Sequence, residues 1–146
     1  MNHANLAVCT HCGAVNGIPE AKDATSAKCG KCKNMLLPPG PTEVNGDIFA
    51  KSISRNTMPV VVDFWAPWCG PCKMMAPQFA AAAARHQGEV IYLKLNTESE
   101  PRVAATYNIR SIPTMAIFVG GKEVARTSGA MDAARIQHWV NSSMGH

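Results

Sequence analysis

DFWAPWCGPCK, residues 63–73, joins a strand-like pattern to a helix-like pattern through two cysteines separated by Gly-Pro. The preceding run, PVVVDFWA (59–66), is almost continuously apolar and β-branched, which is typical of a strand buried on both faces. From Pro71 to about His86 the chain is expected to be helical. Cys69 would therefore lie at a helix N-terminus, where unpaired amides and the helix dipole favour an anion.

This position suits the Cys69 thiol to nucleophilic chemistry. A helix N-terminus lowers the pKa of a cysteine and raises the fraction of thiolate, which is the form that attacks a disulfide. Cys72 lies one turn further into the predicted helix, where it should be more buried and could resolve a mixed disulfide formed on Cys69. Gly70 lets the chain bend into the helix, and Pro71 fixes φ in its first turn.

Helical and strand patterns alternate through the second, longer part of the chain. Apolar residues recur at helical spacing in 46–54, and a second buried strand is expected at 90–96. A short helix at 101–107, a hairpin within 114–129 and an amphipathic helix at 132–144 complete the pattern. The order α β α β α β β α predicts an α/β fold with a parallel central sheet and an antiparallel edge.

The first part of the chain shows little periodicity but contains four more cysteines, again in Cys-x-x-Cys pairs. The two pairs are sixteen residues apart, a spacing typical of two knuckles that close on one zinc ion. Four thiolates leave no open coordination position, so the site would be structural, and a segment so poor in apolar residues needs such support to fold. The expected ligands are Cys9, Cys12, Cys29 and Cys32.

Alternatives remain for these four cysteines. They could form two disulfides or remain free thiols, and His3 or His11 could replace a sulfur as a zinc ligand. Disulfides are disfavoured because the cytoplasm keeps thiols reduced.

A proline-rich stretch divides the chain. Three prolines and a glycine at 38–41 exclude a helix or a central strand and indicate a semi-rigid linker. The chain has 146 residues, enough for one domain with a proper core and a small appendage. The predicted organisation is a zinc-binding module at 1–37, the linker at 38–41 and a larger domain at 42–146.

Composition and charge argue against several functional classes. The net charge of +4 divides evenly between residues 1–40 and the remainder, and no basic run indicates a nucleic-acid partner. The start, MNHANLAVCTHC, lacks a signal-peptide pattern, and no apolar run approaches the roughly 20 residues that span a membrane. We therefore expect a cytoplasmic protein whose six cysteines are metal ligands or redox catalysts.

One acid lies inside a predicted strand. By alternation Val61, Asp63 and Trp65 share a face, and in a sheet covered on both sides this carboxylate is buried. Lys94 interrupts the second strand in the same way and could pair with it. The pair could be structural, or Asp63 could accept a proton from Cys72 through water. Elsewhere, His86 and His138 are expected to be surface residues.

Three motifs together resemble the thioredoxin family: VVDFWAPWCGPCK (61–73), IRSIPT (109–114) and TSGA (127–130). The resemblance covers about 42–146. With the zinc-binding module at 1–37, called the leader from here on, the whole chain resembles the zinc-containing thioredoxin-2 subfamily of bacteria. It implies a thioredoxin fold, a central mixed β-sheet flanked by helices, with a small zinc-ribbon-like module before it.

The resemblance also implies roles for individual residues. Cys69 and Cys72 would form the redox-active disulfide, with Asp63 and Lys94 supporting proton transfer. Pro113 would follow a cis peptide bond facing the cysteines. The substrate would be contacted by Trp68, Ile112, Gly129 and Ala130.

The implied function is protein-disulfide reduction, an electron-transfer role in cell redox homeostasis. The family's electron donor is thioredoxin reductase, a flavoprotein that uses NADPH; one Zn²⁺ per chain, no organic cofactor and a monomer are expected. A second hypothesis is a zinc-controlled binding module in which the larger domain serves as a scaffold. The leader could also respond to oxidants, because thiolates that become disulfides no longer hold zinc.

Overall fold

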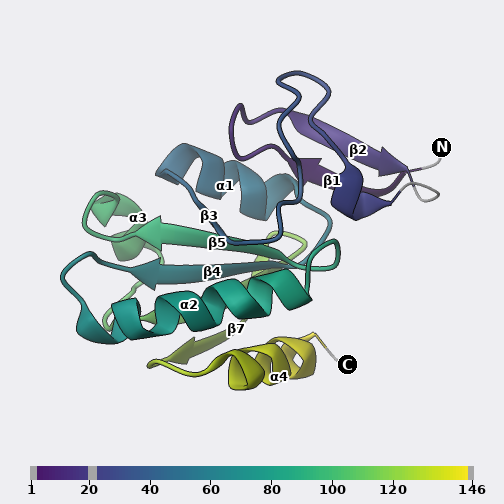
Figure 1. Cartoon of the computed structure of the whole chain (residues 1–146). Helices are drawn as coiled ribbons and strands as arrows, with labels where there is room; N and C mark the ends of the chain where they lie inside the picture. The colour runs from purple at the N-terminus through teal and green to yellow at the C-terminus, as the bar shows by residue number, and fades with distance from the viewer. Residues whose placement is uncertain (1–2, 20–22, 145–146) are drawn as a thin grey trace.

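The computed structural model describes residues 3–19 and 23–144 and contains a five-stranded sheet with a two-stranded hairpin beside it (Figure 1). The strands are β1 (His3–Val8), β2 (Val15–Pro19), β3 (Thr42–Glu43), β4 (Val60–Trp65), β5 (Ile91–Asn96), β6 (Thr114–Val119) and β7 (Lys122–Ser128). The helices are α1 (Gly46–Arg55), α2 (Gly70–Arg85), α3 (Pro101–Thr106) and α4 (Ala133–Ser143), with a 3₁₀ turn, η1, at Ala24–Ser26. Within these described ranges no helix combines the length and apolarity needed to cross a membrane.

The large sheet has the strand order β3-β5-β4-β6-β7. β3, β5 and β4 are parallel, and β6 and β7 are antiparallel, so the predicted mixed sheet is confirmed. Gly120 and Gly121 form the turn between β6 and β7, both with positive φ (60° and 83°), a conformation that glycine adopts without strain.

Helices cover both faces of this sheet. Val61 packs with α2 and α4 in one apolar cluster, whereas Val62 and Phe64 pack with α1 and α3 in the other. This division is the alternation expected of a strand buried on both sides. Asp63 and Trp65 therefore lie on the α2 side of the sheet.

The N-terminal hairpin of β1 and β2 was not predicted from the sequence. Both strands are short, and their apolar residues do not alternate regularly, so no strand pattern stands out. The pairing is antiparallel, with Val8 opposite Val15, which places a cysteine turn at its end.

This hairpin is bonded directly to the end of α1. The backbone N–H of Thr57 donates to Leu6 O at 3.0 Å, and Leu6 N–H donates to Thr57 Oγ1 at 2.8 Å. Val8 N–H donates to the buried Asn56 Oδ1 at 2.9 Å. Met58 completes an apolar cluster whose other buried members belong to the first 37 residues, so the two parts share a core.

A disulfide centre and a four-cysteine cluster

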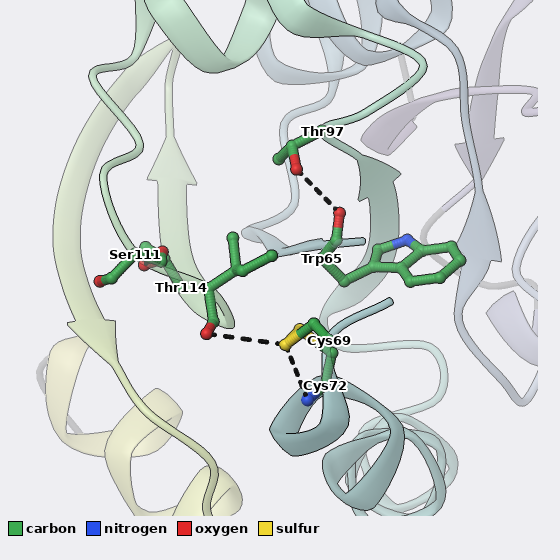
Figure 2. Close-up of a disulfide and its surroundings, with 7 residues drawn as sticks. Trp65, Cys69, Cys72, Thr97, Ser111 and Thr114 are labelled. Carbon is green, nitrogen blue, oxygen red and sulfur yellow. Dashed lines mark hydrogen bonds between the residues drawn. A yellow bond between two sulfur atoms is a disulfide. The ribbon is translucent and has the colours of Figure 1, made fainter. Parts of the chain in front are cut away.

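Cys69 and Cys72 form a disulfide at the start of α2, with Cα atoms 5.2 Å apart (Figure 2). Cys69 is the N-cap residue, and the Cys72 amide donates to its sulfur at 3.2 Å. Both side chains are buried, Cys72 slightly more than Cys69. This is the predicted strand–turn–helix arrangement, in which the helix N-terminus favours a thiolate at Cys69 after reduction.

A loop from the other side of the sheet approaches this disulfide. The Ile112–Pro113 peptide bond is cis, as expected, and Ile112 O lies 3.7 Å from Cys69 Sγ. Gly129 N–H donates to Pro113 O at 2.9 Å, and Gly129 has a φ of 100°, which requires glycine. The three motifs of the sequence thus meet at one end of the sheet.

The surface beside the disulfide is partly apolar. Trp68 is 68% exposed and Met74 is 74% exposed. Gly129 and Ala130 are also exposed. Met74 and Ala130 line the same surface pocket, so exposed apolar groups lie together here, as is typical of a contact surface.

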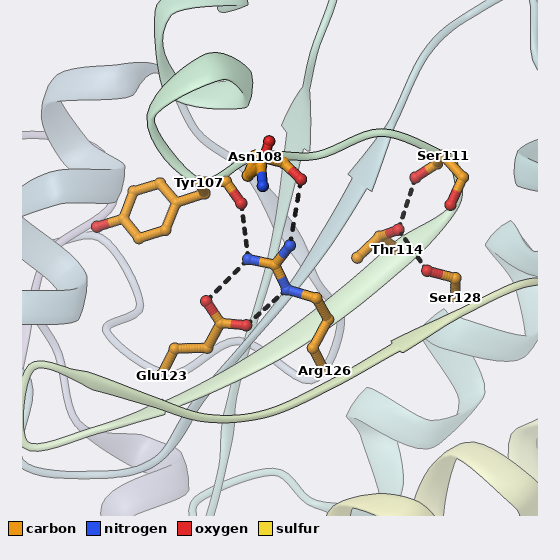
Figure 3. A network of polar contacts seen from close by, with 7 residues as sticks. All are labelled: Tyr107, Asn108, Ser111, Thr114, Glu123, Arg126 and Ser128. Carbon is orange, nitrogen blue, oxygen red and sulfur yellow. Dashed lines mark hydrogen bonds and ion pairs between the residues drawn. The ribbon is translucent and has the colours of Figure 1, made fainter.

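A polar network holds the loop that contains Pro113 (Figure 3). Arg126 on β7 donates to Tyr107 O at 2.7 Å, and Glu123 accepts from the same guanidinium at 2.6 and 2.9 Å. Thr114 Oγ1 donates to Ser111 O at 2.6 Å. Ser111 and Thr114 lie within the IRSIPT motif, whereas no motif or spacing in the sequence distinguishes Tyr107, Glu123 or Arg126.

Asp63 is fully buried, as predicted, and its carboxylate has no hydrogen-bond partner in the described part of the chain. Burial raises the pKa of this carboxyl to about 7, Lys94 lowers it and Glu43 raises it further. A pKa near neutrality suits a group that must both accept and release a proton.

The ion pair that Asp63 and Lys94 could have formed is not present. The two residues are direct neighbours on β4 and β5, but among the described residues the only ion pair within 4.0 Å is Arg126–Glu123. The Lys94 ammonium lies over the Trp65 ring instead, 4.6 Å from its centroid. A cation held over an indole keeps part of its hydration while remaining close to the carboxylate.

His86 is buried rather than exposed, so this prediction was wrong. Its Nδ1 lies 2.6 Å from the Tyr92 hydroxyl and its Nε2 lies 3.2 Å from Asn141 Oδ1. The residue ends α2 where that helix packs against β5 and α4, so its ring has polar partners within the core. His138 is exposed, as expected.

The other four cysteines form one cluster. Their sulfur atoms all lie within 4.8 Å of one another, and two cross-knuckle pairs, Cys9–Cys32 and Cys12–Cys29, are 3.6 Å apart. These separations exceed a disulfide bond of about 2 Å. They fit a tetrahedron around zinc, whose edges are about 3.8 Å for Zn–S bonds of about 2.3 Å. His11 is not part of the cluster.

The two knuckles have matching backbones. Gly13 and Lys33, each directly after the second cysteine of a pair, have φ of 80° and 69°. Asn34 Nδ2 donates to Cys32 Sγ at 3.3 Å, and Lys31 N–H approaches Cys29 Sγ at 3.4 Å. Such N–H···S bonds stabilise thiolates, and the pKa of Cys29 is lowered to about 5, chiefly by the Cys32 amide.

Two family profiles match the chain. The thioredoxin profile matches residues 40–142. The chain belongs to the thioredoxin family. A second profile, described as thioredoxin 2, N-terminal, matches residues 8–34, which contain the four-cysteine cluster.

Similar proteins agree with this assignment. Thioredoxin C-3 of Corynebacterium nephridii is 45% identical over 139 residues, 95% of each chain. The thioredoxin of Porphyra purpurea is 40% identical over 100 residues, which are 68% of this chain and 94% of its own. The crystal structure of chloroplastic thioredoxin z superposes with a TM-score of 0.67 at 26% identity, covering 73% of this chain and 96% of that chain. This thioredoxin is accordingly a thiol-disulfide oxidoreductase, and its four-cysteine cluster is compatible with zinc binding.

Proposed function

We propose that this chain is a cytoplasmic protein-disulfide reductase in which Cys69 is the nucleophile and Cys72 the resolving cysteine. The observation that carries the proposal is the Cys69–Cys72 disulfide at the N-terminus of α2. In the reduced protein the Cys69 thiolate attacks a substrate disulfide, forms a mixed disulfide and releases one substrate thiolate. Cys72 then attacks Cys69, which restores the internal disulfide and releases the second substrate thiol.

Asp63 supplies the proton acceptor for Cys72 in this scheme. Its burial raises the pKa to about 7, so near neutral pH the carboxylate can take up the thiol proton and release it later. Lys94, its neighbour on β5, stabilises the charged form of the carboxylate. The internal disulfide is then reduced by two electrons from NADPH, delivered by the flavoprotein thioredoxin reductase.

The substrate segment lies across the surface around the disulfide. Trp68, Gly129 and Ala130 are exposed there and provide apolar and backbone contacts. The Ile112 backbone, held by the cis bond to Pro113, pairs with the substrate strand close to Cys69. The chain acts as a monomer on protein substrates, without nucleic acid or membrane partners.

Cys9, Cys12, Cys29 and Cys32 hold one structural zinc ion. Bound zinc supplies a cross-link between the knuckles, and a closed set of four thiolates leaves no position for water or substrate. Oxidation of these thiolates to disulfides by a peroxide would remove the ligands that hold the metal, and the leader would then respond to oxidants.

The alternative is a binding scaffold that performs no redox chemistry. The intact Cys69–Cys72 disulfide and the buried Asp63 favour the reductase, because a scaffold gains nothing from a buried carboxylate without a partner.

Replacement of the nucleophile tests the proposal. Cys69→Ser is expected to lower reduction of a protein disulfide by NADPH and thioredoxin reductase by at least about 10³-fold, since a hydroxyl is not ionised near pH 7. Ser54→Ala, at an exposed position of α1 outside both cysteine sites, serves as the control. Retained turnover in Cys69→Ser would contradict the assigned mechanism.

A further inference from the structure

Three charged residues form a row across the sheet. Glu43 on β3 is the direct neighbour of Lys94 on β5, and Lys94 is the direct neighbour of Asp63 on β4. Residues in register on adjacent strands have side chains on the same face. The row therefore places a lysine between two acids, on the face of the sheet that α2 covers.

Glu43 uses both carboxylate oxygens to hold the ends of the two neighbouring strands. Its Oε1 accepts from Trp65 Nε1 at 2.9 Å, and its Oε2 accepts from the Asn96 backbone N–H at 3.0 Å. The Lys94 ammonium lies 4.6 Å from the centroid of the same indole. Glu43 thus fixes the ring on which the lysine rests.

The environment of Asp63 makes the position of that lysine important. From β5 and β3 the charged groups acting on Asp63 are Lys94 and Glu43, with opposite effects on its pKa. Its neighbour on β6 is Met115, which carries no charge. At the start of α2, the Cys69 and Cys72 sulfurs carry no charge while they form the disulfide, and the Lys73 side chain is exposed to solvent. Lys94 is thus the one cation of this set, and any movement of its ammonium changes the field at Asp63.

We propose that Glu43 is a positioning residue for Asp63: by holding Trp65, it keeps the Lys94 ammonium over the indole and out of direct contact with the buried carboxylate. This inference rests on the proposed function, in which Asp63 accepts the Cys72 proton. Its consequence is that β3, a two-residue edge strand directly after the linker, helps to set the pH at which the disulfide chemistry runs.

Two substitutions at one position separate positioning from charge. Glu43→Ala removes both hydrogen bonds and the charge, whereas Glu43→Gln removes the charge but keeps an oxygen that can accept from Trp65. In the oxidised protein, the pKa of Asp63 is read directly from its carboxyl carbon by NMR, and the Trp65 indole N–H signal reports the hydrogen bond. Glu43→Ala is expected to lower the pKa of Asp63 by about half a pH unit more than Glu43→Gln does, because the ammonium then approaches the carboxylate.

Glu100 provides the matched control. It lines the same surface pocket as Glu43 and Trp65, and in the described residues no hydrogen bond links its side chain to the indole. Glu100→Ala removes the same charge and should leave the pKa of Asp63 unchanged. Equal shifts in Glu43→Ala and Glu43→Gln, or an equal shift in Glu100→Ala, would overturn the proposal. If Glu43→Ala does not fold, Glu43→Leu takes its place, because leucine also removes the charge and both hydrogen bonds but fills more of the space. A shift in Glu43→Leu no larger than that in Glu43→Gln then overturns the proposal.

Activity distinguishes this inference from the proposed function. In reduced protein the acidic limb of the pH–rate profile should move in Glu43→Ala by the same amount as the NMR pKa. An unchanged rate in Asp63→Asn would remove Asp63 from the reductase mechanism, yet the NMR comparison would still test whether Glu43 positions Lys94.

Discussion

Asp63 imposes a pH dependence on folding. In the folded chain its pKa rises from an ordinary value of 3.8 to about 7, so the native state keeps a proton that the unfolded chain has already released. Stability therefore falls as pH rises from about 4 to about 7 and stays low above that, a loss of about 4 kcal/mol. Asp63→Asn should accordingly raise the free energy of unfolding by a few kcal/mol at pH 8, and the gain should shrink towards pH 4. Urea titrations at both pH values check this, and an equal difference at both would argue against a raised pKa.

The positions of single residues were predictable where a sequence pattern or a motif indicated them. Strand alternation alone predicted that Asp63 is buried, and the family motif predicted the cis bond at Pro113. Glu43 escaped notice because a two-residue strand carries no periodicity, and its importance depends on pairing between strands distant in sequence. His86 was wrongly predicted to be exposed because the sequence does not show that Tyr92 and Asn141 provide hydrogen-bond partners for its ring inside the core.

Between elements, Arg126 joins β7 to the segment that leads from α3 into β6. Its guanidinium donates to Tyr107 O and to the carboxylate of Glu123, so it links β7 to the backbone of that segment. Arg126→Met is expected to lower the free energy of unfolding by about 1 kcal/mol and to speed amide exchange at 107–112. Lys122→Met, on the same strand and exposed, is the matched control. If the two variants exchange alike, the network does not hold this loop.

The helices and longer strands of residues 42–146 were predictable because burial against the core gives their apolar residues a regular spacing along the sequence. The expected helix at 46–54 is α1, Gly46–Arg55, and the expected strand at 59–66 is β4, Val60–Trp65. β1 and β2 were missed because their stability comes from the knuckles and from bonds to Asn56 and Thr57, none of which is visible as a local pattern.

For the whole molecule, the four-cysteine cluster and the thioredoxin core are expected to be coupled. We expect one zinc per chain, and its removal by a chelator should loosen the hairpin of β1 and β2. Because Thr57 N–H bonds to Leu6 O, protection of the Thr57 amide against exchange should fall together with that of β1. Hydrogen exchange with and without chelator measures this, and an unchanged Thr57 amide would mean that the two parts are independent.

The core shared through Met58 limits how this chain could be recombined with its relatives. Met58 is 3% exposed and belongs to an apolar cluster whose other buried members come from the leader, including Cys9, with Ile91 of β5 packed against the cluster. Loss of the leader would expose the Met58 side chain to water. Transfer of the leader to another protein would leave its apolar cluster without this side chain. Relatives that lack the leader are therefore expected to carry a smaller or more polar side chain at the position of Met58 more often than relatives that have it.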